Sequence, residues 1–435
     1  MSVSITEPDV SERPGLLYYE FLPLVRRSKD TGQLQFQDLE DVIDRANEWC
    51  RQFSSYRIVT LETVQFKFQD RDDASTAGGD DAGASESAPQ SCTDVTKSRQ
   101  YHGDGLRVWL FPSENQGPCE IGFRDLIPRR TGVDGQKVYE SIPQLLGRFN
   151  AEQERGDNPI PGKIINVESR DVKNKESGSS YEGSPSTGFS GVWTLRIFFY
   201  RQEPMRERIC VHDVVPRPYD SYTFEDLPAV MKRASIWLQN ASPLRLYNVQ
   251  TLFVKAKLRA PPGTTLSQKF RSLVRYLKVV RLVFSKFPET APEFRSLVTP
   301  RALSHRLFIP QLQDQGRPVK VGDAIQALKE KMSLWSANMA GDVLCAESLT
   351  VDYHPGKPLY SINLTIPESV NATYGQDVPK TRVVLYFRVY TNCHVPVSSE
   401  SRLLTRASRT QVAKPIVMPK QVRPMQQKRS MCRVM

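Results

Sequence analysis

The chain has 435 residues, of which 39% are hydrophobic and 25% charged, a composition typical of a globular protein with room for two or three domains. No run approaches the ~18 apolar residues of a membrane helix, which predicts a protein without a transmembrane segment. The N-terminus lacks the basic and apolar regions of a secretory signal, and the seven cysteines form no CxxC pair. We therefore expect an intracellular protein, cytoplasmic in the first instance, with the nucleus as the alternative.

The net charge of +11 is concentrated at the C-terminus. Residues 401–435 carry nine basic side chains and no acidic one, which leaves 50 basic and 48 acidic residues in the rest of the chain. The lack of an apolar period predicts a disordered basic tail at 399–435 and a disordered acidic insertion at about 70–100. The tail residues that could contact a nucleic acid or another anion are Arg402, Arg406, Arg409, Lys414, Lys420, Arg423, Lys428, Arg429 and Arg433.

Two segments of the chain repeat each other. Phe36–Cys50 and Phe224–Leu238 share Phe, Asp, Leu, Val, Arg, Ala and Trp at matching positions. In both, apolar residues recur at helical spacing, which predicts an amphipathic helix. A third copy spans 325–335, and a weaker one without the Trp spans 142–149. The chain is therefore built from internal repeats.

Strand patterns accompany each helix. The strand that follows the helix carries an acid or amide at one position: Glu62, Glu168, Gln250 and Glu347. After a loop of variable length, the next strand has an arginine at its second position: Arg107, Arg196, Arg281 and Arg382. A short apolar stretch that ends in proline precedes each helix, at Pro23, Pro128, Pro216 and Pro310. Three residues before these prolines stand Glu20, Asp125, Asp213 and, as a departure, Leu307.

The unit is thus β-α-β-β, in which the first two strands run in the same direction and the third returns antiparallel. We predict an α+β fold of four tandem repeats, with mixed sheets and the amphipathic helices packed on one face, most economically as two pseudo-symmetric pairs. The expected units are residues 15–117, 118–204, 205–292 and 293–398, followed by the tail.

The recurring acids and arginines allow two interpretations. They could form an acid/base or anion-binding site on one face of a sheet. We favour cross-strand ion pairs on a solvated face, each worth ~0.2–1 kcal/mol, because duplication of a scaffold copies such pairs into every unit. The predicted pairs are Glu62 with Arg107, Glu168 with Arg196, and Glu347 with Arg382.

Other chemistry is weakly represented. Trp49, Trp237 and Trp335 could stack a base or sugar, but they extend the apolar stripe of each helix, so we expect core packing. The five histidines lack metal-ligand spacing, and no GxGxxG or GxxxxGK[ST] run occurs. We predict no catalytic residues, no metal and no cofactor, and lean against an enzyme. A search for an unrepeated site would begin at His212, Tyr353 and His354.

Three functions remain open at this stage. The favoured one is a non-enzymatic scaffold or interaction module with protein partners. The second is binding of nucleic acid or another anionic surface through the basic tail. The third is a small-molecule or enzymatic site in a cleft between paired repeats.

Overall fold

The computed structural model describes most of the repeat region. The described residues are 15–27, 34–52, 55–69, 100–113, 120–131, 139–173, 191–219, 224–241, 243–256, 275–286, 302–310, 313–314, 317–318, 321–339, 341–353, 371–373 and 382–393. The predicted tail and residues 70–99 of the acidic insertion lie outside these ranges. None of the helices within them is long and apolar enough to cross a membrane.

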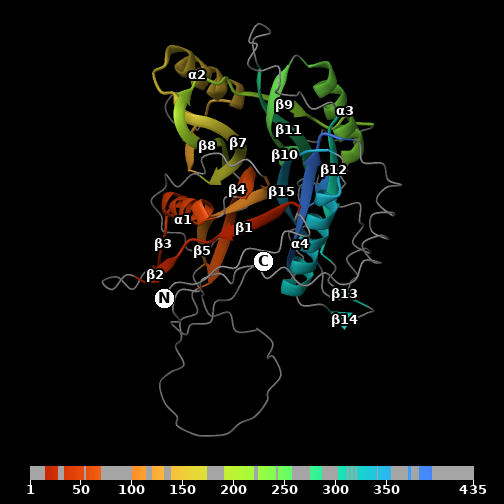
Figure 1. Cartoon of the computed structure of the whole chain (residues 1–435). Helices are drawn as coiled ribbons and strands as arrows, with labels where there is room; N and C mark the ends of the chain where they lie inside the picture. The colour runs from red at the N-terminus through yellow and green to blue at the C-terminus, as the bar shows by residue number, and fades with distance from the viewer. Residues whose placement is uncertain are drawn as a thin grey trace, which may run out of the picture.

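The first two units each contain one helix and a three-stranded sheet (Figure 1). Unit 1 consists of β1 (Leu17–Phe21), α1 (Leu39–Gln52), β4 (Tyr56–Gln69) and β5 (Gln100–Pro112). Between β1 and α1 lies a small hairpin of β2 (Val25–Arg27) and β3 (Leu34–Phe36). Unit 2 consists of β6 (Ile121–Leu126), α2 (Ile142–Arg155), β7 (Ile160–Lys173) and β8 (Gly191–Met205).

The last two units repeat this plan. Unit 3 consists of β9 (Cys210–Val214), α3 (Leu227–Asn240), β10 (Leu244–Ala256) and β11 (Arg275–Lys286). Unit 4 consists of β12 (Ser304–Phe308), α4 (Val321–Ala337), β15 (Val343–Tyr353) and β17 (Arg382–Thr391). It also contains a hairpin of β13 (Gln313–Asp314) and β14 (Arg317–Pro318), and the short β16 (Asn371–Thr373), which pairs with β11 of unit 3.

The third strand of every unit lies in the middle of its sheet. It pairs antiparallel with the first strand on one side and with the second strand on the other. The first two strands therefore run in the same direction without touching, and all the described ladders are antiparallel rather than mixed. The predicted α+β fold of four β-α-β-β repeats is confirmed.

The four units form a closed ring, where two pseudo-symmetric pairs were expected. The second strands β4, β7, β10 and β15 lie at the centre of the molecule, with the helices around them (Figure 1). Each of these strands contacts the second strand of both neighbouring units, and the contact between β15 and β4 joins the last unit to the first. Every unit therefore has two neighbours in equivalent positions.

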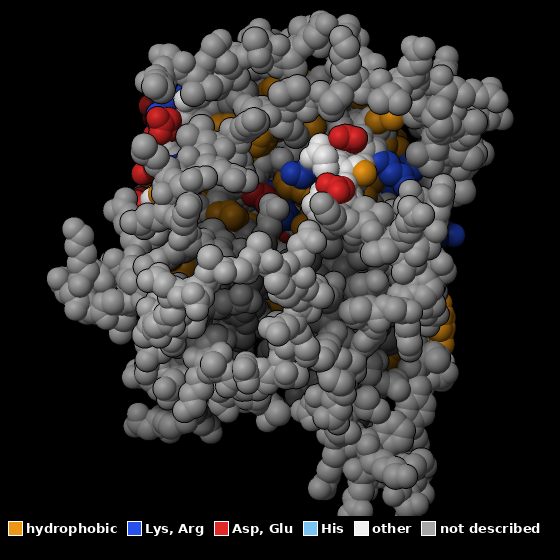
Figure 2. All heavy atoms as spheres, turned by 90° about the horizontal axis from the view of Figure 1, so that it is seen from below, with side chains coloured by type: hydrophobic (Ala, Val, Ile, Leu, Met, Phe, Trp, Pro, Cys, Tyr) orange, Lys and Arg blue, Asp and Glu red, His pale blue; other side chains and the backbone are white. Residues whose placement is uncertain are grey.

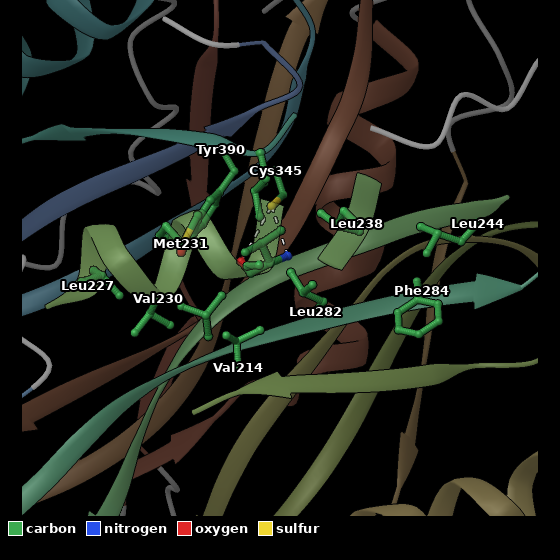
Figure 3. Close-up of a cluster of buried hydrophobic side chains, with 14 residues drawn as sticks. Val214, Leu227, Val230, Met231, Leu238, Leu244, Leu282, Phe284, Cys345 and Tyr390 are labelled. Atoms are coloured by element: carbon green, nitrogen blue, oxygen red, sulfur yellow. Dashed lines mark hydrogen bonds between the residues drawn. The ribbon is translucent and has the colours of Figure 1, made fainter. Parts of the chain in front are cut away.

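Each sheet is covered on both faces, which corrects the expectation of one helix-covered and one solvated face. One face packs on the helix of its own unit and the other on the helix of the preceding unit. In the core of unit 3, Val230 and Met231 of α3 meet Cys345 and Tyr390, which come from the sheet of unit 4 (Figure 3). The other three cores are built in the same way.

A one-residue bulge in each second strand makes this double coverage possible. The pairing of second and third strands skips one residue three positions before the acid or amide, namely Val59, Ile165, Tyr247 and Leu344. A bulge turns its extra side chain to the opposite face of the strand. All four skipped side chains pack against the core of the preceding unit. Burial of one such side chain is worth ~1.5–3 kcal/mol.

One polar residue of each helix binds the backbone at or just before the start of the first strand of the following unit. Asn47 of α1 donates to the carbonyl of Ile121 at 3.0 Å and accepts from its N–H at 2.7 Å. Asn150 makes the same pair of bonds to Ile209, at 2.9 Å each. Ser235 accepts a single bond from the equivalent N–H of Leu303 at 3.0 Å, and Ser333 accepts one from Gly15, one residue before the equivalent position. We call Asn47, Asn150, Ser235 and Ser333 the helix clasp.

The clasp of unit 4 closes the ring onto unit 1. Ser333 accepts from the N–H of Gly15 at 2.9 Å, and Ser336 accepts from the N–H of Leu16 at 2.6 Å. The two backbones approach so closely that a methyl group on Gly15 would lie 2.0 Å from the carbonyl oxygen of Ser333. Glycine is therefore required at this junction.

We predict that Gly15→Ala lowers the free energy of unfolding by about 1–3 kcal/mol, because the added carbon forces β1 and α4 apart. The matched control is Gly147→Ala in α2, where a methyl group meets nothing within 4 Å. This control should raise the stability by up to about 1 kcal/mol through helix propensity. Urea denaturation measures both changes. Equal stabilities of the two variants would contradict the tight junction.

Candidate functional site: a polar ring between the units

The acid of each second strand reaches across to the preceding unit. Glu168 of unit 2 accepts hydrogen bonds from the backbone N–H of Thr63, at 2.9 Å, and from the Thr63 hydroxyl. Glu347 of unit 4 accepts from the N–H and the hydroxyl of Thr251, at 2.8 and 2.7 Å. One carboxylate thus satisfies two donors of its neighbour, in charge-assisted bonds worth ~1.5–3 kcal/mol each.

Glu62 and Gln250 complete the circle. Glu62 of unit 1 accepts from the N–H of Ser348 in unit 4, at 2.9 Å, and from its hydroxyl. Gln250 of unit 3 accepts from the N–H of Ser169 at 2.8 Å and donates to the carbonyl of Ser169 at 2.9 Å. Every unit therefore gives one such contact and receives one. We call these four contacts the polar ring.

The signal for this ring is present in the sequence as a dipeptide. The acid or amide is followed directly by the hydroxyl residue that the next unit binds, in Glu62-Thr63, Glu168-Ser169, Gln250-Thr251 and Glu347-Ser348. Sequence analysis singled out the first member and missed the second, because the partner of the hydroxyl lies in another unit.

The arginines hold the polar ring in place from the third strands. Arg196 forms a bidentate ion pair with Asp125 of its own first strand, with both N–O distances 2.6 Å. It also donates to the Thr63 hydroxyl of unit 1 at 3.0 Å. Arg281 does the same with Asp213, at 2.7 and 2.6 Å, and with Ser169 at 3.0 Å. Each guanidinium therefore links two strands of its sheet to the neighbouring unit.

The predicted cross-strand pairs differ in whether the two residues lie opposite each other and form the ion pair. Glu62 lies opposite Arg107, and their charged groups are 3.2 Å apart. Glu168 lies opposite Arg196, yet Arg170, at 3.7 Å, makes the ion pair with it. In both pairs the acid also serves the neighbouring unit, which the prediction did not anticipate.

The predicted pair of Glu347 with Arg382 is wrong. Arg382 lies opposite Tyr353, at the far end of the ladder, whereas Arg388 lies opposite Glu347 with its guanidinium 3.0 Å from the carboxylate. Both arginines follow an aromatic or polar residue and precede Val, so their local patterns are alike. The register is set by the bulge and by the buried residues of β17, which run from Tyr386 to Tyr390.

The arginines and the second-strand acids are largely buried, which overturns the expectation of a solvated face. The side chain of Arg388 is 0% exposed and that of Arg107 is 4% exposed. Burial raises the pKa of Glu62 to about 7, although Arg107 and Ser348 favour its ionised form. It also raises the pKa of Glu168. Because desolvation offsets much of the Coulomb attraction, such a network fixes which surfaces meet more than it adds stability.

Unit 4 departs from the others at the first strand. Leu307 lies opposite Arg388, in the place of the acid that units 1 to 3 have there. Arg388 donates to Glu347 at 3.0 Å, and the same carboxylate accepts from the Tyr390 hydroxyl at 2.6 Å. Gln250, by contrast, stands beside an arginine that Asp213 already neutralises. The one amide of the polar ring thus stands in a unit whose first strand supplies the acid.

The tryptophans do not offer free stacking faces. Tyr19 packs on Trp49 with ring centroids 4.2 Å apart, and His212 stacks on Trp237 at 4.0 Å. Arg306 lies over Trp335 at 5.2 Å. The three partners occupy the same position of the first strand, so His212 is part of the repeat rather than a unique site.

The other candidate site residues do not form a reactive or ligand-binding group among the described residues. Tyr353 is the last residue of β15, and His354 lies outside the described residues, as do all nine basic tail residues. Within the described ranges, no group of three His, Cys, Asp or Glu side chains could hold a metal ion. Burial raises the pKa of the Cys345 thiol well above its ordinary value, and the thiol donates to the Val249 carbonyl, so it packs rather than reacts.

Among the described residues, one buried ionic cluster occurs in a single copy, between units 2 and 3. The hydroxyl of Tyr247 donates to Glu207, and Arg245 lies 3.3 Å from the same carboxylate. Tyr247 is the bulge residue of unit 3, where the other units have an aliphatic side chain. The buried hydroxyl requires an acceptor, and the acceptor requires a counter-charge. The cluster is thus a consequence of a tyrosine at this position.

The surface carries a repeated feature at the end of each first strand. In units 1 to 3 the residue before the proline that recurs ahead of each helix is apolar and exposed. The exposed fractions are 38% for Leu22, 67% for Ile127 and 50% for Val215. An arginine of the following helix donates to the carbonyl of each of these residues, from Arg45, Arg148 and Arg233 respectively. We call these three loops the proline corners.

A second set of hydrogen bonds makes the proline corners stiff. The N–H after Pro128 donates to Glu140 at 2.9 Å, and Arg148 pairs with the same carboxylate at 2.9 Å. Glu225 and Arg233 form the same frame in unit 3, and Gln37 accepts the equivalent N–H in unit 1. The prolines themselves are buried. The exposed aliphatic side chains are therefore held in fixed positions.

Comparison with known proteins gives no relative: the chain matches no family model, no curated protein and no solved structure.

We predict that Glu62→Gln reduces the dependence of stability on pH. Glu62 binds its proton more tightly in the folded chain than in the unfolded one, so the stabilisation is complete below about pH 4.5 and is lost as the pH rises to about 7. This amounts to at most about 3 kcal/mol. The free energy of unfolding, measured between pH 4 and 8, should fall less steeply in the variant; parallel curves would contradict the buried carboxyl.

We predict unequal costs for the same substitution at two positions of the polar ring. Glu62→Gln should cost at most about 1 kcal/mol at pH 7, because Arg107 keeps Glu20. Glu347→Gln should cost about 3–5 kcal/mol, because this one buried carboxylate pairs with Arg388 and also accepts from Thr251 and Tyr390. Denaturation of the two variants under one condition provides the comparison. The idea fails if Glu62→Gln is the more costly change.

Proposed function

We propose that the protein is a non-enzymatic scaffold that binds protein partners at its proline corners. The observation that supports this is the repeated exposure of a fixed aliphatic side chain in three equivalent loops. An exposed aliphatic side chain alone is ordinary on a protein surface. A side chain held by the same hydrogen-bonded frame in three units is a pre-ordered contact point, and binding to it requires little loss of conformational entropy.

The use of the charged groups supports the same proposal. The buried arginines spend their hydrogen bonds on their own sheet and on the neighbouring unit, as Arg196 does with Asp125 and Thr63. Groups committed in this way bind strands together rather than a substrate. A rigid ring of repeated units presents equivalent surface loops, as other repeat proteins do on their extended binding surfaces.

The test is to place a photo-crosslinking amino acid at position 127 or 215 of the full-length protein in lysate of its source cells. The control position is Leu334 on α4, which is 48% exposed, as Val215 is at 50%, but belongs to no corner. We expect the same crosslinked partner from both corners and not from position 334. If positions 127 and 215 yield nothing beyond position 334, the proline corners are not a binding surface.

A further inference from the structure

We propose that the corners of units 2 and 3 together bind a partner segment that combines apolar and acidic side chains. This inference rests on the proposed function and adds the chemistry of the partner. At both corners the exposed aliphatic residue is followed, after the buried proline, by an exposed arginine: Ile127 by Arg129 and Val215 by Arg217.

The arginines at these corners are available for a partner. The side chain of Arg129 is 68% exposed, and its contact with Glu152 is long, at 3.9 Å. Arg217 is exposed as well, and its backbone N–H anchors the corner to Glu225 at 2.9 Å. Each corner thus presents one apolar and one cationic group, two residues apart, on a stiff backbone. Their complement is an aliphatic side chain next to a carboxylate.

The charges around the corners favour a patterned protein segment over a uniformly anionic lipid surface. Two residues before each exposed aliphatic side chain lie Asp125 and Asp213, whose side chains are 33% and 35% exposed. Both acids are ion-paired with an arginine of their own sheet. A peptide can place one carboxylate opposite each corner arginine, whereas anchoring to an anionic lipid surface relies on clusters of several basic side chains. Elsewhere on the described surface acidic and basic side chains also lie close together, as Figure 2 shows.

Units 2 and 3 are neighbours in the ring, because β7 contacts β10. Their corners therefore occupy equivalent positions in two successive units, and a partner with two copies of the same short segment could use both. Binding of the second copy is then intramolecular and gains from its high effective concentration.

The probes are synthetic peptides in which leucine and glutamate alternate with serine, as a single segment and as a flexibly linked tandem. Matched peptides carry lysine in place of glutamate. We expect the full-length protein to bind the glutamate peptide at least about ten-fold more tightly than the lysine peptide at low salt. The tandem should bind more tightly still, and Ile127→Ser should reduce it to the affinity of the single segment.

The decisive variant is the double charge reversal Arg129→Glu with Arg217→Glu. It should reverse the preference, so that the lysine peptide binds more tightly than the glutamate peptide, while Leu334→Ser leaves binding unchanged. Thermal unfolding confirms that each variant is folded. Equal binding of both peptides to the wild type would overturn the inference, as would tight binding to phosphatidylserine vesicles that Ile127→Ser with Val215→Ser abolishes. If either of these results is obtained but the crosslinking experiment at positions 127 and 215 still yields a protein partner, the scaffold proposal stands and only the partner class is wrong.

Discussion

The fold depends on one interaction: a side-chain acceptor on the second strand of a unit binds the backbone N–H of the strand beside it in the preceding unit. These strands belong to different sheets, so their backbones cannot form a ladder with each other. A carboxylate or amide bridges the gap and satisfies a buried donor that would otherwise lack a partner. Since each unit both gives and receives this bond, the arrangement is complete only when four units have closed into a ring.

The double coverage of the sheets follows from the same geometry. Bringing the second strands together at the centre places each sheet between two helices, and the bulge supplies the side chain that fills the core of the preceding unit. A single unit could not bury both faces of its sheet. The duplication of the unit is therefore a physical requirement of this packing, and the charged groups that join the units are buried as a consequence.

Periodicity and repetition were sufficient to predict the unit, its helices and its strand directions, because these depend on local patterns such as the stripe of Val42, Ile43 and Ala46. The ring could not be predicted, because the partners of Glu62 and Asn47 lie in other units and leave no mark in their own neighbourhood. The register of β17 was missed for a related reason: Arg382 and Arg388 look alike locally, and only the buried partners distinguish them. The proline corners were noticed as a repeat, but exposure is a property of the folded surface.

The clasp of α4 on Gly15 joins the last unit to the first by non-covalent contacts. During synthesis the sheet of unit 1 leaves the ribosome before α4, the helix that covers the face with Tyr18 and Trp109. That aromatic face must remain uncovered while some three hundred residues are translated. The nascent chain therefore exposes an aggregation-prone aromatic surface for most of its elongation, and a chaperone that shields aromatic residues would protect it until the ring closes.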